Sequence, residues 1–426
     1  MISVNEVYNI FLQSTGVNTD TKTVMHGNIF FGLKGNRYNG NSFAGEALEK
    51  GASFAVIDEP KYKINEQCLL VDNVLSTLQQ LANHHRNQLN IPVIGITGTN
   101  GKTTTKELIN HVLSTKYKVY ATEGNLNNHI GVPLTLLKIN KKDAQIAIIE
   151  MGANHVGEIK ELCQIAEPNY GIITNIGKAH LEGFGSVDRI IETKSALYQS
   201  VKANHGTVFV NSGDKLLMEF SSDIKRITYG QLSGNCKGIC QENNLLIKII
   251  LPDHSVEIQT QLAGDYNFYN IMGAITVGLY FSIPIDDIKF ALEKYIPNNR
   301  SQLIKKNNKF IIIDAYNANP SSMELAICNL AKIQTSPKSL LLGDMFELGE
   351  SSVKEHQRIV DLIRKYSFDT VYLLGEAFAK TNADTSWVYT NAEQLSIALK
   401  KTLPENTTLL IKGSRAMKME LFLNII

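Results

Sequence analysis

The segment Gly98–Thr104 has the residue types and the spacing of a loop that binds phosphate groups. It reads Gly98-Thr99-Asn100-Gly101-Lys102-Thr103-Thr104. Glycines allow main-chain N–H groups to curl around phosphate oxygens, and a helix that begins there adds free N–H groups and its dipole. Lys102 would reach the terminal phosphates, and the Thr103 hydroxyl would bind magnesium. The segment therefore predicts binding of a nucleoside triphosphate, with ATP as the expected ligand.

This loop is a shorter variant of the common phosphate-loop pattern. The pattern G-x-x-x-x-G-K-[ST] would need a glycine at position 96, where this chain has Ile96. The available glycine is Gly98. A plain strand–turn–helix corner is the structural alternative, but the Gly-Lys-Thr run lies where the apolar run Val93–Thr97 leads into a predicted helix, which favours the phosphate loop.

Two further polar residues follow predicted strands. Glu150 comes after Ala144–Ile149, and His180 comes a few residues after Gly171–Thr174. Ligands bind at the carboxyl edge of parallel sheets, where a carboxylate can hold magnesium. The alternatives are an ordinary acid at a strand end and a structural histidine. Lys194 lies on a predicted helix, and its own sequence context indicates only a solvated surface lysine.

The pattern of elements predicts an α/β fold with three domains, at residues 1–90, 91–296 and 297–426. Strands and helices alternate in the second block, which is typical of a parallel sheet with helices on both faces. The third block repeats this alternation after a linker at Pro297–Asn299. We therefore expect a central ATP-binding domain, a smaller N-terminal domain and a Rossmann-like C-terminal domain.

Composition limits the class of protein and its location. The 426 residues carry 42 basic and 41 acidic side chains, and this balance argues against a nucleic-acid-binding surface. Five scattered cysteines argue against a disulfide framework and favour a reducing compartment. No signal peptide and no membrane span are predicted, so we expect a cytoplasmic protein.

The ordered motifs resemble those of the Mur ligase family over nearly the whole chain. The resemblance rests on the phosphate loop, the Glu150 strand end, Asn175–His180, Lys194 and Gly264-Asp265-Tyr266-Asn267-Phe268-Tyr269-Asn270. These ATP-dependent enzymes extend the peptide of the peptidoglycan precursor. The resemblance implies phosphorylation of a substrate carboxylate to an acyl phosphate, which an amine then attacks.

Four segments are similar to those of family members that add D-alanyl-D-alanine to UDP-N-acetylmuramoyl-tripeptide. They are Glu123–Pro133, Asp314–Met323, Gly343–Gly349 and Lys412–Arg415. The Asp-Asn-Pro-Arg motif of the relatives that add a diamino acid is not visible in the chain. The resemblance therefore implies these two small-molecule substrates, and the family expectation is a monomer.

The resemblance also implies roles for single residues. Thr103 and Glu150 would bind one magnesium ion, and His180 and a carbamylated Lys194 would bind a second. Lys102, His180 and Lys194 would form the catalytic set. Other residues would contact the nucleotide, and two more are weaker candidates for binding the substrate. Asn267 and Asn270 would approach the adenine, Arg300 and Asp314 would reach the phosphates and ribose, and Lys412 and Arg415 are the candidates for the substrate side.

The first block would hold the uridine nucleotide. Asp20–Lys22 and Gly27–Gly35 resemble the family's uridine-site strings, although the family usually has arginine where Lys22 stands. Two other readings remain open. One is a different ligase of the same kind, adding a diamino acid or extending folylpolyglutamate; the other is a phosphate-loop switch or binding module without amide chemistry.

Overall fold

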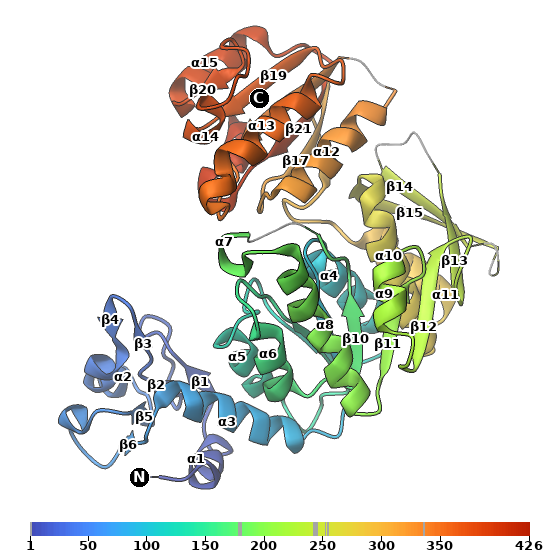
Figure 1. The fold of residues 1–426 in the computed structure, drawn as a ribbon. Coiled ribbons are helices and arrows are strands. Elements are labelled where there is room, and N and C mark those ends of the chain that lie inside the picture. Colours follow the sequence, from blue (N-terminus) through green and yellow to red (C-terminus); the bar gives the residue numbers. More distant parts are fainter. Residues whose placement is uncertain (1, 178–180, 242–245, 252, 254, 335–336) are drawn as a thin grey trace.

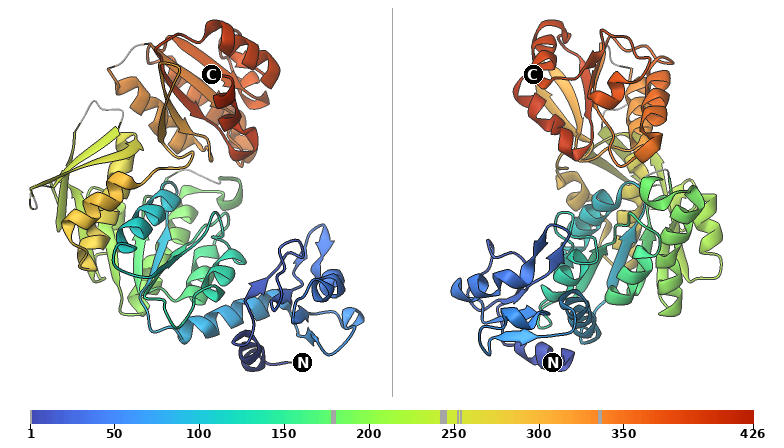
Figure 2. Two further views of the ribbon diagram at one scale, coloured as in Figure 1. Left: turned by 180° about the vertical axis from the view of Figure 1, so that it is seen from behind. Right: turned by 60° about the vertical axis from the view of Figure 1, so that its left-hand side comes forward.

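The computed structural model describes residues 2–426 except residues 178–180, 242–245, 252, 254 and 335–336. Three α/β domains lie along an arc, with the N-terminal domain at one end and the C-terminal domain at the other (Figures 1 and 2). The predicted fold class is confirmed, since the sheets are mostly parallel.

The N-terminal domain is built on a four-stranded parallel sheet. In sheet order its strands are β1 (Val17–Asn18), β2 (Ile29–Phe31), β5 (Phe54–Ile57) and β6 (Cys68–Leu70). A short hairpin of β3 (Lys34–Gly35) and β4 (Tyr38–Asn39) lies beside it. Its helices are α1 (Val4–Phe11), α2 (Ala44–Glu49) and α3 (Val74–Asn87). One sheet face packs on α2, and the other packs on α1 and α3.

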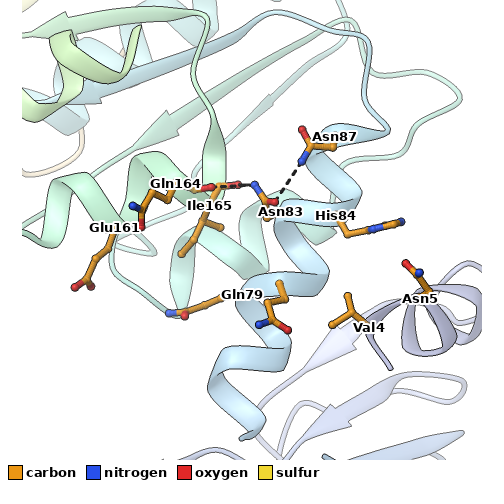
Figure 3. Close-up of a pocket in the computed structure, with 10 residues that line it drawn as sticks. Val4, Asn5, Gln79, Asn83, His84, Asn87, Glu161, Gln164 and Ile165 are labelled. Atoms are coloured by element: carbon orange, nitrogen blue, oxygen red, sulfur yellow. Dashed lines mark hydrogen bonds between the residues drawn. The ribbon is translucent and has the colours of Figure 1, made fainter. Parts of the chain in front are cut away.

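Helix α3 fixes this domain to the central one. Its apolar residues Leu78 and Leu81 belong to a core that also contains Val132 of α5 (Gly131–Leu137) and Ile159 of α6 (Glu158–Ala166). A pocket of about 530 Å³ runs along α3 between α1 and α6 (Figure 3). No residue predicted for the site lines this pocket.

The central domain contains six parallel strands. In sheet order they are β8 (Val119–Ala121), β9 (Ile146–Glu150), β7 (Val93–Thr97), β10 (Tyr170–Ile173), β11 (Thr207–Asn211) and β12 (Arg226–Gln231). One face is covered by α4 (Lys102–Leu113), α10 (Phe268–Tyr280) and α11 (Ile285–Lys294). The other face is covered by α5, α6 and α8 (Val187–Ala203). Helices α7 (Leu181–Phe184) and α9 (Lys215–Phe220) are short. Helices on both faces confirm the predicted arrangement.

The sheet continues beyond β12 into strands that the sequence reading did not place. They are β13 (Cys236–Cys240), β14 (Leu246–Leu251) and β15 (Val256–Ala263). Strand β13 runs parallel to β12, whereas β14 and β15 continue as an antiparallel meander. The central sheet is therefore mixed, because short connections here permit hairpins in place of helical crossovers.

The C-terminal domain has its own sheet with helices on both faces. In sheet order the strands are β20 (Val388–Tyr389), β19 (Thr370–Leu374), β18 (Lys338–Gly343), β21 (Thr408–Lys412), β17 (Lys309–Asp314) and β16 (Gln302–Lys306). Its helices are α12 (Pro320–Lys332), α13 (Ser352–Ile363), α14 (Glu376–Ala379) and α15 (Ala392–Thr402). All strand pairs are parallel except β16 with β17. Strand β16 also pairs with β15 of the central domain, through Leu262 and Gln302.

No helix in the described ranges is both long and apolar enough to cross a membrane.

Candidate nucleotide-binding site

The phosphate loop lies between β7 and α4 at the carboxyl edge of the central sheet. Gly98 has a φ of +149° and Gly101 a φ of +80°, which are backbone conformations that favour glycine. Gly101 is also the N-cap of α4, so the helix begins at Lys102 with its N–H groups directed at the loop. A Cβ at Gly98 would lie 1.9 Å from the Thr174 hydroxyl oxygen, so only glycine fits there. The predicted strand–loop–helix geometry is confirmed.

The residues after β10 hold the loop from one side. The Asn100 N–H donates to Asn175 Oδ1 at 3.0 Å, and Asn175 Nδ2 donates back to the Asn100 carbonyl at 3.0 Å. Thr174 Oγ1 donates to the same carbonyl. The Thr99 hydroxyl accepts from the Gly177 N–H and donates to the Gly177 carbonyl. The loop conformation is thus fixed by the neighbouring strand, before any ligand binds.

Glu150 lies directly behind the loop. It is the last residue of β9 rather than the residue after it, and it is 1 % exposed. Its Oε1 atom accepts from the Thr103 hydroxyl at 3.1 Å and from Asn127 Nδ2 at 2.9 Å. Its Oε2 atom is buried and, in the described part of the chain, has no hydrogen-bond partner. A buried carboxylate oxygen without a partner is costly, so this atom is available to a cation.

A second set of contacts positions the main chain of Glu150. Its N–H donates to the Thr122 hydroxyl at 2.9 Å, and the Thr122 carbonyl accepts from Lys106 Nζ at 2.5 Å. Lys106 is 1 % exposed although it is charged. The segment that begins at Thr122 also carries Asn127, so this segment holds both the main chain of Glu150 and the Oε1 atom of its side chain.

Lys102 and Lys194 meet at the loop. Lys102 Nζ donates to the carbonyls of Gly98 and Thr99 at 2.8 and 3.1 Å, and Lys194 Nζ donates to the Gly98 carbonyl at 3.1 Å. Burial lowers the pKa of Lys194 to about 7, and the charge of Lys102 acts in the same direction. Burial also lowers the pKa of Lys102, which Glu150 opposes and Arg300 reinforces.

Lys194 is therefore not the surface lysine that its own sequence context indicated. It is 2 % exposed and lies on the buried face of α8. The signal was present in the helical spacing, because position 194 follows the buried Ile190 by four residues and precedes the buried Leu197 by three. In the residues that the structure describes, no carboxylate lies within ion-pair distance of its Nζ atom.

Asn267 and Asn270 lie beneath the turn of the loop. Asn270 Nδ2 donates to Asn267 Oδ1 at 2.8 Å, and Asn270 Oδ1 accepts from the Thr105 hydroxyl at 3.2 Å. A Cβ at Gly101 would lie 2.5 Å from Asn270 Oδ1. The two asparagines therefore support the loop through side-chain contacts, and Thr104 is buried in the same region.

The C-terminal domain contributes charged groups at the carboxyl ends of β17 and β21. Asp314 and Lys412 stand opposite each other in register, and Lys412 Nζ lies 2.6 Å from Asp314 Oδ2. The Arg300 guanidinium lies 3.5 Å from the centre of the Tyr316 ring, and that of Arg415 lies 5.3 Å from it. The charge of Arg300 also contributes to the lowered pKa of Lys102.

The residues predicted for the uridine site lie in the N-terminal domain, away from the phosphate loop. In the N-terminal domain, Thr21 donates to Glu46, and Lys34 forms ion pairs with Asp58 and Glu59 at 2.8 and 3.1 Å. His180 falls within residues 178–180, which are outside the described part of the chain. Contacts of Asn127, Thr122 and Asn319 were not assigned from the sequence, because each depends on pairing between distant segments.

A glycine loop that leads from a parallel strand into a helix, with a lysine, a threonine hydroxyl and a buried carboxylate beside it, defines a phosphate-loop nucleotide-binding domain. Three family models match the chain. They are "Mur ligase family, catalytic domain" at residues 13–95, "Mur ligase middle domain" at residues 96–278 and "Mur ligase, glutamate ligase domain" at residues 299–415.

Individual relatives agree with these matches. The UDP-N-acetylmuramoyl-tripeptide--D-alanyl-D-alanine ligase of Bacillus subtilis (strain 168) is 35% identical, over 95% of this chain and 91% of the relative. The crystal structure of MurF from Acinetobacter baumannii is 31% identical, with a TM-score of 0.84 over 96% and 92% of the two chains. MurF ligase from Thermotoga maritima, solved in complex with ADP, is 26% identical, with a TM-score of 0.87 over 97% of each chain. The chain belongs to the Mur ligase family.

Proposed function

We propose that the chain is an ATP-dependent ligase that joins D-alanyl-D-alanine to UDP-N-acetylmuramoyl-tripeptide in peptidoglycan synthesis. The names of the relatives that match over nearly the full length support these substrates. The observation that carries the chemistry is the pairing of the phosphate loop with Glu150, whose Oε2 atom is buried beside the Thr103 hydroxyl without a partner. A threonine hydroxyl beside a buried carboxylate is the magnesium-binding arrangement of phosphate-loop enzymes, and the match to ligases over all three domains favours amide chemistry over a nucleotide switch.

The reaction proceeds in two steps. A carboxylate oxygen of the tripeptide attacks the γ-phosphorus of ATP, and ADP leaves, which gives an acyl phosphate. The amine of the dipeptide attacks the acyl carbon and loses a proton, and inorganic phosphate leaves. Because two anions must meet in the first step, Lys102 and Arg300 supply the positive charge that holds the phosphates.

Magnesium fits the residues at the loop. The Thr103 hydroxyl and the Glu150 carboxylate are oxygen donors of the kind that Mg²⁺ prefers, and the buried Oε2 atom gains a partner when a cation is present. A second ion is proposed at His180 and Lys194. Bound magnesium would supply positive charge to the phosphate oxygens.

We propose that Lys194 binds the second magnesium ion in the form of its carbamate. The neutral amine reacts with carbon dioxide, forms an N–C bond and releases a proton, and the product is an anionic oxygen ligand. Burial beside Lys102 lowers the pKa of Lys194 to about 7, and this favours the neutral amine of Lys194 at physiological pH. In the described residues no carboxylate neutralises its charge, so a carbamate would relieve the repulsion between the two lysines.

The remaining assignments follow the three domains. We place the domains at residues 1–90, 91–296 and 297–426. The first domain holds the uridine nucleotide, the second holds ATP, and the third holds the amine of the dipeptide. Asn267 and Asn270 approach the adenine, and Asp314 contacts the ribose. The C-terminal domain closes on the bound nucleotide, since Arg300 and Asp314 lie beyond the linker. The protein acts as a monomer in the cytoplasm.

The decisive test is a substrate-dependence assay of phosphate release. Release of phosphate from ATP should need both the nucleotide tripeptide and D-alanyl-D-alanine, and mass spectrometry should identify the pentapeptide. Small-angle scattering should show a smaller radius of gyration when both nucleotides are bound. Release without either substrate, or with glutamate and folate in their place, would redirect the assignment to a different enzyme.

A further inference from the structure

The side-chain amide of Asn319 contacts two domains at once. Asn319 is the N-cap of α12, and its Oδ1 atom accepts from the Ser322 N–H at 2.8 Å. Its Nδ2 atom donates to Asn100 Oδ1, in the phosphate loop, at 2.8 Å. One half of the amide therefore begins a helix of the C-terminal domain, and the other half contacts the loop that binds ATP.

The acceptor on the loop side is fixed in place. Both main-chain polar groups of Asn100 are hydrogen-bonded to the segment after β10, through Asn175 and Thr174. Its side chain therefore extends toward the C-terminal domain from a rigid backbone. The first turn of α12 also fits closely against this segment, since a Cβ at Gly177 would lie 3.3 Å from Ser321 Oγ.

The donor on the C-terminal side is equally restrained. The N–H of Asn319 donates to Ser322 Oγ at 3.1 Å, which completes a capping box. A cap of this kind holds the side chain in one rotamer. Serine caps helices about as well as asparagine but is too short to reach Asn100, and it has no amide nitrogen. The residue type is therefore explained by the contact between the domains as well as by the cap.

We infer that Asn319 is a positioning residue, which sets where the C-terminal domain docks on the phosphate loop in the ligation step. This inference rests on the proposed function, in which the amine is held by the C-terminal domain and the acyl phosphate forms at the loop. An error of about 1 Å between two reacting groups costs on the order of 100-fold in rate. The contact between Asn319 and Asn100 limits part of that error without touching the reacting atoms.

The test compares Asn319→Ser, Asn100→Ala and the double variant. Asn391→Ser serves as the matched control, because Asn391 caps α15 of the same domain through the Glu393 N–H and has no role at the loop. Two products are measured. Hydroxylamine intercepts the acyl phosphate as a hydroxamate and reports the first step, whereas the pentapeptide reports both steps.

Asn319→Ser should lower kcat for pentapeptide formation about tenfold, which is the effect of one hydrogen bond of about 1.4 kcal/mol. Its hydroxamate rate and its Tm should stay close to those of Asn391→Ser. The double variant should lose no more than Asn319→Ser alone, because both changes remove the same contact. A hundredfold, additive loss, an equal loss of hydroxamate and pentapeptide, or kcat equal to that of Asn391→Ser would overturn the inference.

Failure of the proposed function gives a different result. In that case the wild-type protein and Asn391→Ser both form no pentapeptide from these substrates. Small-angle scattering of the protein with ATP bound then tests the docking role of the contact between Asn319 and Asn100 separately from ligation. A larger radius of gyration for Asn319→Ser than for Asn391→Ser supports the docking role, and equal radii overturn it.

Discussion

Lys102 and Lys194 direct their Nζ atoms at one acceptor, the carbonyl of Gly98, with N–O distances of 2.8 and 3.1 Å. One lysine belongs to the helix of the phosphate loop and the other to α8, on the opposite face of the sheet. Two positive charges at one neutral acceptor would repel each other, which is one reason why the pKa of Lys194 is lowered to about 7, and the site therefore favours anions. The phosphates of ATP would neutralise Lys102, and carbamylation would convert Lys194 into an anion.

Lys194→Ala should abolish ligation, because the variant lacks the nitrogen on which the proposed carbamate would form. A short carboxylic acid such as acetate should restore part of the activity by placing an oxygen anion in the vacated space, whereas added bicarbonate should not. Lys202→Ala is the matched control on the same helix, since Lys202 is exposed and pairs with Asp223. Full pentapeptide formation by Lys194→Ala would remove the carbamate from the mechanism.

Glu150→Gln should reduce substrate-dependent phosphate release on the order of 100-fold, because the site would lose the anionic ligand that we propose for magnesium. Binding of the nucleotide tripeptide, measured by calorimetry, should change little, since we propose that its uridine end binds to the N-terminal domain. Glu161→Gln, on the exposed side of α6, should behave as wild type. Unchanged turnover in Glu150→Gln would exclude Glu150 from the metal site.

Gly98→Ala should eliminate ATP binding, measured by calorimetry. The new methyl group would lie 1.9 Å from Thr174 Oγ1, and that hydroxyl holds the loop through the Asn100 carbonyl. Gly157→Ala is a useful comparison. Gly157 also has a positive φ, +89°, but has open space around it, so its substitution should cost about 1–2 kcal/mol in stability and leave ATP binding intact. Equal ATP affinity in both variants would contradict the steric argument.

The stability of the protein should fall as the pH drops below about 6.5, in part through His356. His356 Nδ1 donates to the Ser352 carbonyl at 2.7 Å, and Nε2 accepts from the Met345 N–H at 3.0 Å, so the ring is held neutral. Burial lowers its pKa, although Asp344 and Glu355 oppose the shift. The unfolded chain then binds a proton more readily than the folded one, and protonation favours unfolding.

Urea denaturation from about pH 8 to about pH 5 measures this effect. The loss of unfolding free energy on acidification should be smaller in His356→Gln, which has no titrating group at this position. His111→Gln replaces an exposed histidine and should keep the wild-type profile. A profile of His356→Gln that is as steep as that of the wild type would assign the acid sensitivity to other groups.

The sequence predicted the parts of the site that depend on local order. A strand followed by glycines and a helix is encoded within one short segment, so Gly98–Thr103 could be placed correctly. The antiparallel strands β13–β15 were missed although β15 shows alternating buried residues at Ile258, Thr260 and Leu262.

Contacts between distant segments could not be read from the sequence. Asn100 and Asn319 lie 219 positions apart, and no local pattern links them. The burial of Lys194 was predictable from the helical spacing of its apolar neighbours, but its partner, the Gly98 carbonyl, was not. Every residue has a main-chain carbonyl, so the residue type does not show which carbonyl accepts a hydrogen bond, and such a contact can be found only in the folded structure.

The pairing of β15 with β16 constrains how the C-terminal domain can move. In the described residues Leu262 and Gln302 are in register there, and the Ala263 N–H donates to the Ser301 carbonyl at 2.8 Å, whereas β16 and β17 pair along their whole length. So short a ladder joins the two domains at one place along the edge of the sheet. The angle of α12 over the phosphate loop is set farther out, where Lys332 lies 2.8 Å from Asp265 near one end of the helix and Asn319 contacts Asn100 at the other, so these two contacts act as the braces of a narrow joint.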